Sequence, residues 1–441
     1  MSEGLSGYRG YARKVLEDAK AEIGDLIRIV KEGFTYEGIL MPRSEYGDEW
    51  HIVVKLSSGY NIGVRVTPET KLYRIRPAEK PTFKRPPPPM GRPGLSRVVV
   101  VSTGGTIASR VDYRTGGVHP ALTAEDLYSV FPELSEIALV EADILYSLYS
   151  ENITPKHWSG MARRVAEHIG RGVEGVIIAH GTDTMGYTAA ALSFALQNLP
   201  VPVILVGSQR SSDRPSSDAA LNLLGAVTAA VKAPFAEVVL AMHEGTSDTS
   251  IALHRGTKVR KCHTSARWAF RSVNTKPIAR VEGDRVTMLT SEYRVRDAKR
   301  KLVLKDRFDD RVALVKFYPA FNPAIIDWYV DEGYRGIILE GTGLGHVGEY
   351  LFNSIRRAVK EGVIVGMTSQ CIWGRVNMNV YCTGRDLQAL GVIPLGDMLP
   401  ETALVKLMWV LGQTKDLEEA KKLLLTNIAY EITPRTRYDA E

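Results

Sequence analysis

From Arg97 onward, short and almost wholly apolar runs alternate with segments that have the apolar spacing of helices. This alternation constrains the fold more than any other feature of the chain. The runs are RVVVVST, VEGVIIAH, VPVILVGS and AEVVLAMH, and the helical stretches between them include TAAALSFAL and DAALNLLGAVTAAV. Continuous runs of Val, Ile and Leu are typical of strands buried on both faces. They predict an α/β domain whose parallel sheet is covered by helices on both sides.

The same pattern starts again after the polar, basic stretch RVRDAKRKLVLKDRF, with the runs RVALVKFYP, RGIILEGTG and VIVGMTSQ. A chain of 441 residues is too long for one ordinary core and is expected to divide into domains. We therefore predict a large α/β domain over residues 97–300 and a small α/β domain over residues 301–441.

The first 75 residues have a different pattern of apolar residues and turn signals. An amphipathic helix is predicted over residues 8–23, followed by the strand-like runs DLIRIV, FTYEGILM, WHIVVKL, YNIGVRV and KLYRI. Short strands separated by turn signals predict a small antiparallel β-barrel over residues 1–75. The proline-rich segment 76–96 is predicted to be an extended linker. Residues 76–97 carry six basic side chains and one acidic one, a net charge of +5, which suits either a solvated spacer or a contact with a phosphate backbone.

Several classes of protein are disfavoured by what the sequence lacks. No apolar stretch approaches the roughly 20 residues that span a bilayer, and the first residues have no apolar signal-peptide core, so we expect a cytoplasmic protein without membrane contact. The three cysteines form no C-x-x-C pair, and Cys371 and Cys382 are expected to be small buried side chains. Phosphate-loop and H-E-x-x-H motifs are also absent, so no metal or nucleotide cofactor is expected in this chain.

The first candidate motif is TGGTIA at residues 103–108, directly after the strand run VVVVS. Paired glycines allow a sharp turn at a strand end and a close approach of substrate to the backbone. Thr106 can present its hydroxyl to a substrate carbonyl, although a hydroxyl of ordinary pKa needs a neighbouring base to act as a nucleophile. Taken alone, the motif is equally compatible with a plain turn.

The second candidate motif is HGTDTM at residues 180–185, between the strand run GVIIA and a predicted helix. Thr182 and Asp183 stand where the helix begins, and a helix N-terminus favours an anionic group nearby. The competing interpretation is that Asp183 or Thr184 only caps the helix. His180 is interpreted as a hydrogen-bonded strand-end residue rather than a base.

Together, the two motifs closely resemble the signature motifs of the L-asparaginase and glutaminase family. The resemblance covers residues 97–436 and includes GSQR at 207–210, DAALN at 218–222 and SQC at 369–371. It implies an α/β protein with asparaginase-like large and small domains, and an amidohydrolase activity on a side-chain amide.

The resemblance also implies roles for individual residues. It places the family's nucleophilic threonine at Thr106, its Thr–Asp pair at Thr182 and Asp183, and its lysine at Lys261. Lys258 is the competing choice for the lysine, and the family's spacing from the preceding glycine favours Lys261. Attack by Thr106 on the amide would give an acyl-enzyme and ammonia, with Lys261 and Asp183 polarising Thr182. Which of the two threonines attacks first stays open.

Three further positions follow from the same resemblance. A family tyrosine in the loop after the nucleophile corresponds to Tyr113, within a polar segment at 109–118 that suits a lid. The residues that hold the α-carboxylate and α-amine of the substrate correspond to Ser150 and Glu151, with glutamate standing where the family has glutamine. The glycine-rich loop 341–345 resembles one that lies near the active site of a neighbouring subunit, which implies a homodimer.

The barrel upstream of an asparaginase-like core resembles the D subunits of archaeal glutamyl-tRNA(Gln) amidotransferases. That resemblance implies a chain that releases ammonia from glutamine or asparagine. The partner, the E subunit of the same amidotransferase, is then expected to use ATP and Mg to activate glutamate on tRNA(Gln), within a heterotetramer. Two alternatives are a free-standing cytoplasmic L-asparaginase with an accessory barrel and a non-catalytic tRNA-binding scaffold. The second is disfavoured because all four catalytic positions are filled.

Overall fold

The computed structural model describes residues 5, 7–43, 47–57, 61–78, 94–104, 109–111, 118–120, 127–128, 131–210 and 216–436. Thr106, Tyr113, most of the predicted linker and residues 112–117 of the predicted lid lie outside the described residues. The chain forms two compact units. One contains the N-terminal domain, and the other contains both α/β domains.

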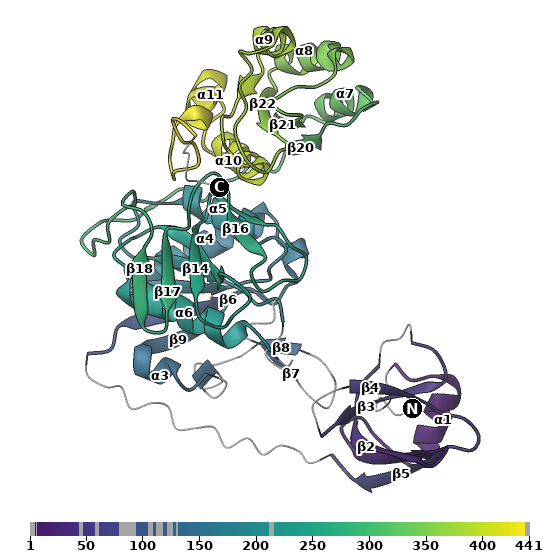
Figure 1. The fold of residues 1–441 in the computed structure, drawn as a ribbon. Helices are drawn as coiled ribbons and strands as arrows, with labels where there is room; N and C mark the ends of the chain where they lie inside the picture. Colours follow the sequence, from purple (N-terminus) through teal and green to yellow (C-terminus); the bar gives the residue numbers. More distant parts are fainter. Residues whose placement is uncertain are drawn as a thin grey trace. The chain divides into compact units, whose positions relative to one another are not determined.

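The N-terminal domain is a five-stranded antiparallel sheet with helix α1 (Gly10–Asp18) packed against it (Figure 1). The strand order is β4-β3-β2-β1-β5, with bounds β1 (Leu26–Lys31), β2 (Phe34–Leu40), β3 (His51–Leu56), β4 (Asn61–Arg65) and β5 (Lys71–Arg76). The predicted antiparallel strands are confirmed. Within the described residues β4 and β5 do not pair, so the expected barrel is open between them. The helix is shorter than predicted because Lys20 has a φ of +51°, which ends the helical path.

The large domain contains an eight-stranded sheet of order β18-β17-β14-β13-β12-β10-β6-β9. Its strands are β6 (Arg97–Ser102), β9 (Leu139–Ile144), β10 (Gly175–Ala179), β12 (Val203–Val206), β13 (Val238–His243), β14 (Ile251–Arg255), β17 (Ala279–Glu282) and β18 (Arg285–Met288). The five strands from β9 to β13 are parallel, as predicted. The sheet then continues antiparallel through β14, β17 and β18, because residues 244–250 join β13 to β14 without a crossover helix.

Helices cover both faces of the parallel strands. Helices α4 (Pro155–Gly170) and α5 (Met185–Ala195) share a core with Val99, Val176 and Ile178 on one face. Helix α6 (Ala219–Lys232) lies against β10, β12 and β13, with the short α3 (Leu134–Ile137) beside it. The strands are buried on both sides, which explains their unbroken Val and Ile runs.

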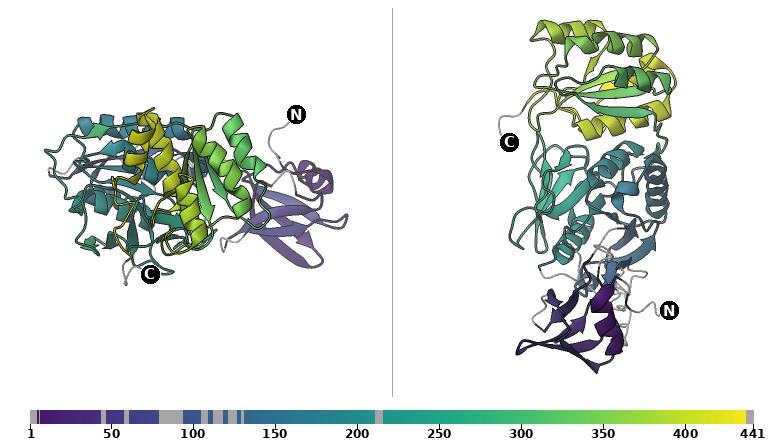
Figure 2. Two further views of the ribbon diagram at one scale, coloured as in Figure 1. Left: turned by 90° about the horizontal axis from the view of Figure 1, so that it is seen from above. Right: turned by 90° about the vertical axis from the view of Figure 1, so that its right-hand side faces the viewer.

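The small domain is a four-stranded parallel sheet made of β20 (Val312–Lys316), β21 (Gly336–Gly341), β22 (Ile364–Ser369) and β23 (Ile393–Pro394). Figure 2 shows helices on both of its faces. Helix α10 (Pro400–Gln413) packs on Ile338 and Ile364, and α11 (Leu417–Leu425) follows it. The opposite face carries α7 (Ala324–Asp331), α8 (Phe352–Lys360) and α9 (Cys382–Ala389). Two α/β domains after a small antiparallel one confirm the predicted fold class.

Short elements complete the described structure. Three two-stranded pairs are antiparallel: β7 (Ser109–Val111) with β8 (Val118–Pro120), β11 (Leu196–Gln197) with β19 (Val303–Leu304), and β15 (Val259–Lys261) with β16 (Phe270–Ser272). Two 3₁₀ turns are η2 (Ser150–Asn152) and η3 (Glu349–Leu351). Among the helices of the described ranges, none is long and apolar enough to cross a membrane.

The prediction that Cys371 and Cys382 are buried was wrong. Both side chains are exposed, as is that of Cys262. Cys371 lies in the loop that follows β22, and Cys382 is the first residue of α9, so neither occupies the apolar face of a strand or helix. Apolar neighbours in sequence did not indicate burial here, because Cys371 lies in a surface loop and Cys382 stands at the exposed start of a helix.

Candidate active site

Three neighbouring parallel strands of the large domain end at one edge of the sheet, and the segment after each carries predicted site residues. Ser102 of β6 pairs with Ile144 of β9 on one side and with Ala179 of β10 on the other. The segments that follow these strands therefore leave the sheet side by side. They are the start of the first motif, the segment that contains η2, and the second motif. The carboxyl edge of an α/β sheet is the usual place for a ligand site.

Lys261 joins two residues of the second motif. It is the last residue of β15, and its Nζ donates hydrogen bonds to Thr182 Oγ1 at 2.9 Å and Asp183 Oδ1 at 2.7 Å. The Lys261 side chain is only 16% exposed, whereas that of Asp183 is 69% exposed. An ammonium that bridges a hydroxyl and a carboxylate forms a charge-assisted network, which is stronger than neutral hydrogen bonds. Three residues that the sequence analysis singled out are thus in direct contact.

Lys258, the competing lysine, has a different environment. It is fully buried, and its Nζ donates to Asp397 Oδ2 at 2.6 Å and to the Asp397 carbonyl oxygen at 3.0 Å. Asp397 belongs to the small domain, after β23. Of the two lysines, Lys261 is therefore the one that contacts Thr182.

Ser150 lies next to the second motif. The Thr184 hydroxyl donates to the Ser150 carbonyl oxygen at 2.6 Å, and a Cβ on Gly181 would meet Ser150 Cβ at 2.8 Å. Glycine at position 181 therefore permits the two segments to approach. The Ser150 side chain is buried, whereas Glu151 is exposed, and the described residues include no hydrogen bond from Glu151 to the Thr182 cluster. Thr184 stands at the helix N-cap and makes no side-chain cap bond, and its hydroxyl donates to the Ser150 carbonyl oxygen.

The first motif begins with a tight turn. Gly104 has a φ of +115°, and a Cβ there would lie 2.0 Å from the Leu148 carbonyl oxygen, so only glycine fits. Thr103 fixes the start of the turn, because its hydroxyl donates to the Ala179 carbonyl oxygen at 3.0 Å. Thr106 follows Gly104 by two residues and lies outside the part of the chain that the structure describes.

His180 is buried at the end of β10 and held by hydrogen bonds on both ring nitrogens. Nδ1–H donates to the Gly181 carbonyl oxygen at 2.7 Å, and Nε2 accepts from the Thr188 hydroxyl at 2.9 Å. Thr188 in turn accepts from Trp158 Nε1 at 3.1 Å. Burial lowers the pKa of His180 to about 4, so the imidazole is neutral near pH 7, and this arrangement of donors fits the neutral ring. The prediction of a hydrogen-bonded strand-end histidine agrees with these contacts.

We expect His180 to make the protein less stable in mild acid. In the unfolded chain the imidazole takes up a proton near pH 6.5, whereas in the folded protein it does so only near pH 4. The unfolded state therefore binds more protons as the pH falls from 7 to 5, which lowers the free energy of unfolding by about 2 kcal/mol. Chemical unfolding at both pH values measures this change. A His180→Gln variant that keeps the full wild-type pH dependence would contradict it.

Some contacts of the site were not anticipated from the sequence. A Cβ on Gly207, which follows β12, would meet Thr182 Cγ2 at 2.9 Å, so glycine there leaves room for the threonine. Thr188 supports His180, and a hydroxyl within the apolar helix segment TAAALSFAL was the available signal for it. Within the described ranges no three His, Cys, Asp or Glu side chains gather as a metal site requires.

Comparison with known proteins decides the family. Three family models match the chain: the GatD N-terminal domain at residues 21–72, asparaginase (N-terminal) at 97–294, and the glutaminase/asparaginase C-terminal domain at 311–424. The D subunit of the glutamyl-tRNA(Gln) amidotransferase of Thermofilum pendens is 49% identical over 98% of both chains. The protein of the same name from Pyrococcus furiosus is 53% identical, over 96% of this chain and 97% of its own. The chain belongs to the family of glutamyl-tRNA(Gln) amidotransferase D subunits.

Solved asparaginases share the fold of the two α/β domains. The thermostable L-asparaginase of Thermococcus kodakarensis superposes with a TM-score of 0.69 at 34% identity. L-asparaginase I of Vibrio cholerae superposes with a TM-score of 0.67 at 30% identity. Each is covered almost completely, at 100% and 99%, but each matches only 77% of this chain. The resemblance to asparaginases is therefore confirmed, and D subunits, unlike these asparaginases, match the chain almost from end to end.

Proposed function

We propose that this chain is the ammonia-releasing subunit of a glutamyl-tRNA(Gln) amidotransferase. It hydrolyses the side-chain amide of glutamine or asparagine and supplies ammonia for the conversion of Glu-tRNA(Gln) to Gln-tRNA(Gln). The observation that carries the chemistry is the contact of Lys261 Nζ with both Thr182 Oγ1 and Asp183 Oδ1, at the edge where the first motif also begins. The near full-length match to D subunits supports the assignment to the complex.

In the proposed reaction, Thr106 Oγ attacks the amide carbon of the substrate. The Oγ–C bond forms, the C–N bond breaks, and the leaving nitrogen takes a proton to depart as ammonia. The proton that Thr106 Oγ loses is the one that the leaving nitrogen gains, and Thr182 with Lys261 provides a hydrogen-bonded route that can carry it without a net change in their own protonation. Water then attacks the carbonyl carbon of the acyl-enzyme and releases the acid, with its proton passing by the same route back to Thr106 Oγ. An alternative that uses the same residues has Thr182 as the first attacker.

We propose that the substrate binds to Ser150, Glu151 and Asp183, next to the contact between Thr182 and Lys261. Ser150 is held beside the second motif by Thr184, and Glu151 follows it with an exposed side chain. Asp183 is also exposed, so it can accept a hydrogen bond from the substrate ammonium while bound to Lys261. Tyr113 is proposed to approach the substrate from the segment that follows the nucleophile.

The remaining proposals concern the assembly. The chain is expected to form a homodimer and to combine with two copies of the E subunit as a heterotetramer in the cytoplasm. No cofactor is proposed for this chain, and ATP and Mg are assigned to the partner, which activates the tRNA-borne glutamate. The basic linker and the N-terminal domain are assigned to assembly rather than to chemistry.

We expect the isolated chain to release ammonia from glutamine slowly, and the partner with Glu-tRNA(Gln) to raise the rate by about tenfold or more, as for a typical coupling of 1–3 kcal/mol. The physical reason is that an unregulated amidase would lose ammonia to solvent. Ammonia release by the full chain provides the test, measured for the chain alone, with the E subunit added, and with both the E subunit and Glu-tRNA(Gln) added.

Each outcome of this experiment selects one function. A maximal rate for the chain alone, unchanged by the additions, would favour a free-standing asparaginase. Absence of hydrolysis under every condition would favour a non-catalytic scaffold. Activity that depends on the additions supports the amidotransferase subunit.

A further inference from the structure

The strand that carries Lys261 is fixed at its start by the C-terminal part of the chain. Lys258 immediately precedes β15, and its buried ammonium binds Asp397 of the small domain. Asp397 also accepts hydrogen bonds from Thr433, from the backbone N–H at 2.8 Å and from the hydroxyl at 2.6 Å. Burial alone would raise the pKa of Asp397, but the Lys258 charge and these bonds outweigh it and hold the pKa below its usual value. The three residues form one fully bonded network.

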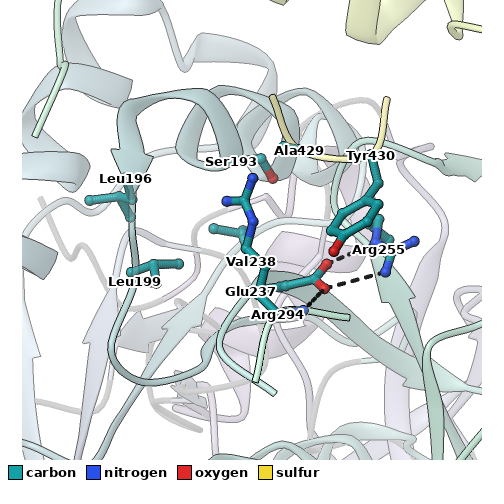
Figure 3. Close-up of a pocket in the computed structure, with 9 residues that line it drawn as sticks. All are labelled: Ser193, Leu196, Leu199, Glu237, Val238, Arg255, Arg294, Ala429 and Tyr430. Atoms are coloured by element: carbon teal, nitrogen blue, oxygen red, sulfur yellow. Dashed lines mark hydrogen bonds and ion pairs between the residues drawn. The ribbon is translucent and has the colours of Figure 1, made fainter. Parts of the chain in front are cut away.

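The turn between β14 and β15 is tied to the same C-terminal segment. Figure 3 shows Tyr430 beside Arg255, the last residue of β14. The guanidinium carbon of Arg255 lies 4.0 Å from the centroid of the Tyr430 ring. Arg255 also donates from Nε to Glu237 Oε2 at 2.8 Å. Two residues later, the Thr257 hydroxyl donates to the Ala429 carbonyl oxygen at 2.8 Å. Residues 255, 257 and 258 are thus each held by a specific partner.

A second link from the small domain reaches the middle of β15. Arg260 Nε lies 3.1 Å from Glu401 Oε1, in the first turn of α10. Lys258 and Arg260 therefore both bind the small domain. Lys261, at the end of the same segment, binds Thr182 and Asp183 in the large domain. A short displacement of this strand would move Lys261 Nζ relative to Thr182 Oγ1.

We propose that the buried Lys258–Asp397 pair, together with Thr433, positions Lys261 against Thr182, so that the small domain sets the geometry of the site in the large domain. The proposal rests on the role of Lys261 in the function proposed above. Lys258 is then a positioning residue, which acts on the reaction only through Lys261. A displacement of about 1 Å in a catalytic group can cost about a hundredfold in rate.

The test is ammonia release by the assembled complex with glutamine and Glu-tRNA(Gln). We expect Lys258→Met to lower kcat by about ten- to a hundredfold and to leave KM within about twofold, because no substrate contact is lost. The matched control is Lys406→Met. Lys406 is equally buried, is paired with Glu431 of the same C-terminal segment and has no bond to β15. The control is expected to lower thermal stability without the fall in kcat.

A double-mutant cycle separates positioning from general loss of structure. In a Lys261→Ala background, Lys258→Met is expected to change the residual rate by less than about twofold, since the residue it positions is gone. If Lys258→Met does not fold, the double variant Lys258→Met and Asp397→Leu removes both buried charges, which usually costs little stability, and it should show the same fall in kcat.

The outcomes distinguish the two proposals. An unchanged kcat in the Lys258 variants, or an equal fall in the Lys406 control, would overturn the positioning role while Lys261→Ala remains inactive. Full additivity in the cycle would overturn it as well. If Lys261→Ala itself retains normal activity, the catalytic lysine of the proposed function is wrong, whatever the Lys258 variants do.

Discussion

Replacing either Thr106 or Thr182 by alanine is expected to lower the rate of amide hydrolysis by at least about a thousandfold, since the members of a nucleophile–base unit each carry most of its rate advantage. Thr182 Oγ1 accepts a hydrogen bond from Lys261, so alanine breaks the proposed proton route at its centre. The Thr182 side chain is half-buried and is not part of the apolar cores, so the fold should persist. Ammonia release and the melting temperature are measured for both variants.

The control for these variants is Thr182→Ser, which keeps the hydroxyl and removes only a methyl group. It should retain a substantial part of the wild-type rate. Near-normal turnover in Thr106→Ala would exclude Thr106 as the nucleophile. Near-normal turnover in Thr182→Ala would reduce its contact with Lys261 to a structural role.

Lys261→Ala is expected to be almost as inactive, with a loss of about a thousandfold in kcat. The substitution removes the only bridge between Thr182 and Asp183 found in the described residues, and leaves the Asp183 carboxylate exposed to solvent. Because Asp183 is largely solvated already, little stability should be lost with the ion pair. Steady-state kinetics and thermal unfolding of the same preparation measure both effects.

An arginine at position 261 tests the mechanism further. Lys261→Arg keeps the positive charge but holds its proton at all relevant pH values, so it should support binding and not proton transfer. Recovery of wild-type kcat in this variant would argue that the residue acts only through its charge.

The sequence predicted most of the strands and helices whose positions depend on hydrophobic packing alone. The unbroken Val and Ile runs indicated β6, β10, β12 and β13 because strands buried on both faces can carry little else. The antiparallel strands β14, β17 and β18 were not anticipated, since their orientation depends on the length of a polar loop and not on hydrophobicity. The end of α1 was misplaced because the left-handed conformation of Lys20 leaves no compositional signal.

The sequence predicted the site only in part, because its main contacts join residues that are far apart in the chain. The paired glycines of the first motif indicated a turn with close approach, and the structure shows the Leu148 backbone against Gly104; the approach of Ser150 to Gly181 was not anticipated. The contact of Lys261 with Thr182 joins residues 79 positions apart, so only the family resemblance could indicate it. The Lys258–Asp397 pair spans 139 positions, and nothing local in the sequence marks either residue as a partner of the other.

The edge of the large sheet has a consequence for how such a protein can diverge. The Ser150 segment is fixed through its main chain, by the bond from Thr184 to its carbonyl oxygen, whereas the neighbouring Glu151 side chain is exposed. A mutation at position 151 can therefore change the charge presented to a ligand without disturbing the backbone that holds it. Under the substrate contact proposed above for Glu151, single substitutions at this point would change how the charged groups of a substrate are held, while Thr182, Asp183 and Lys261 are inherited unchanged.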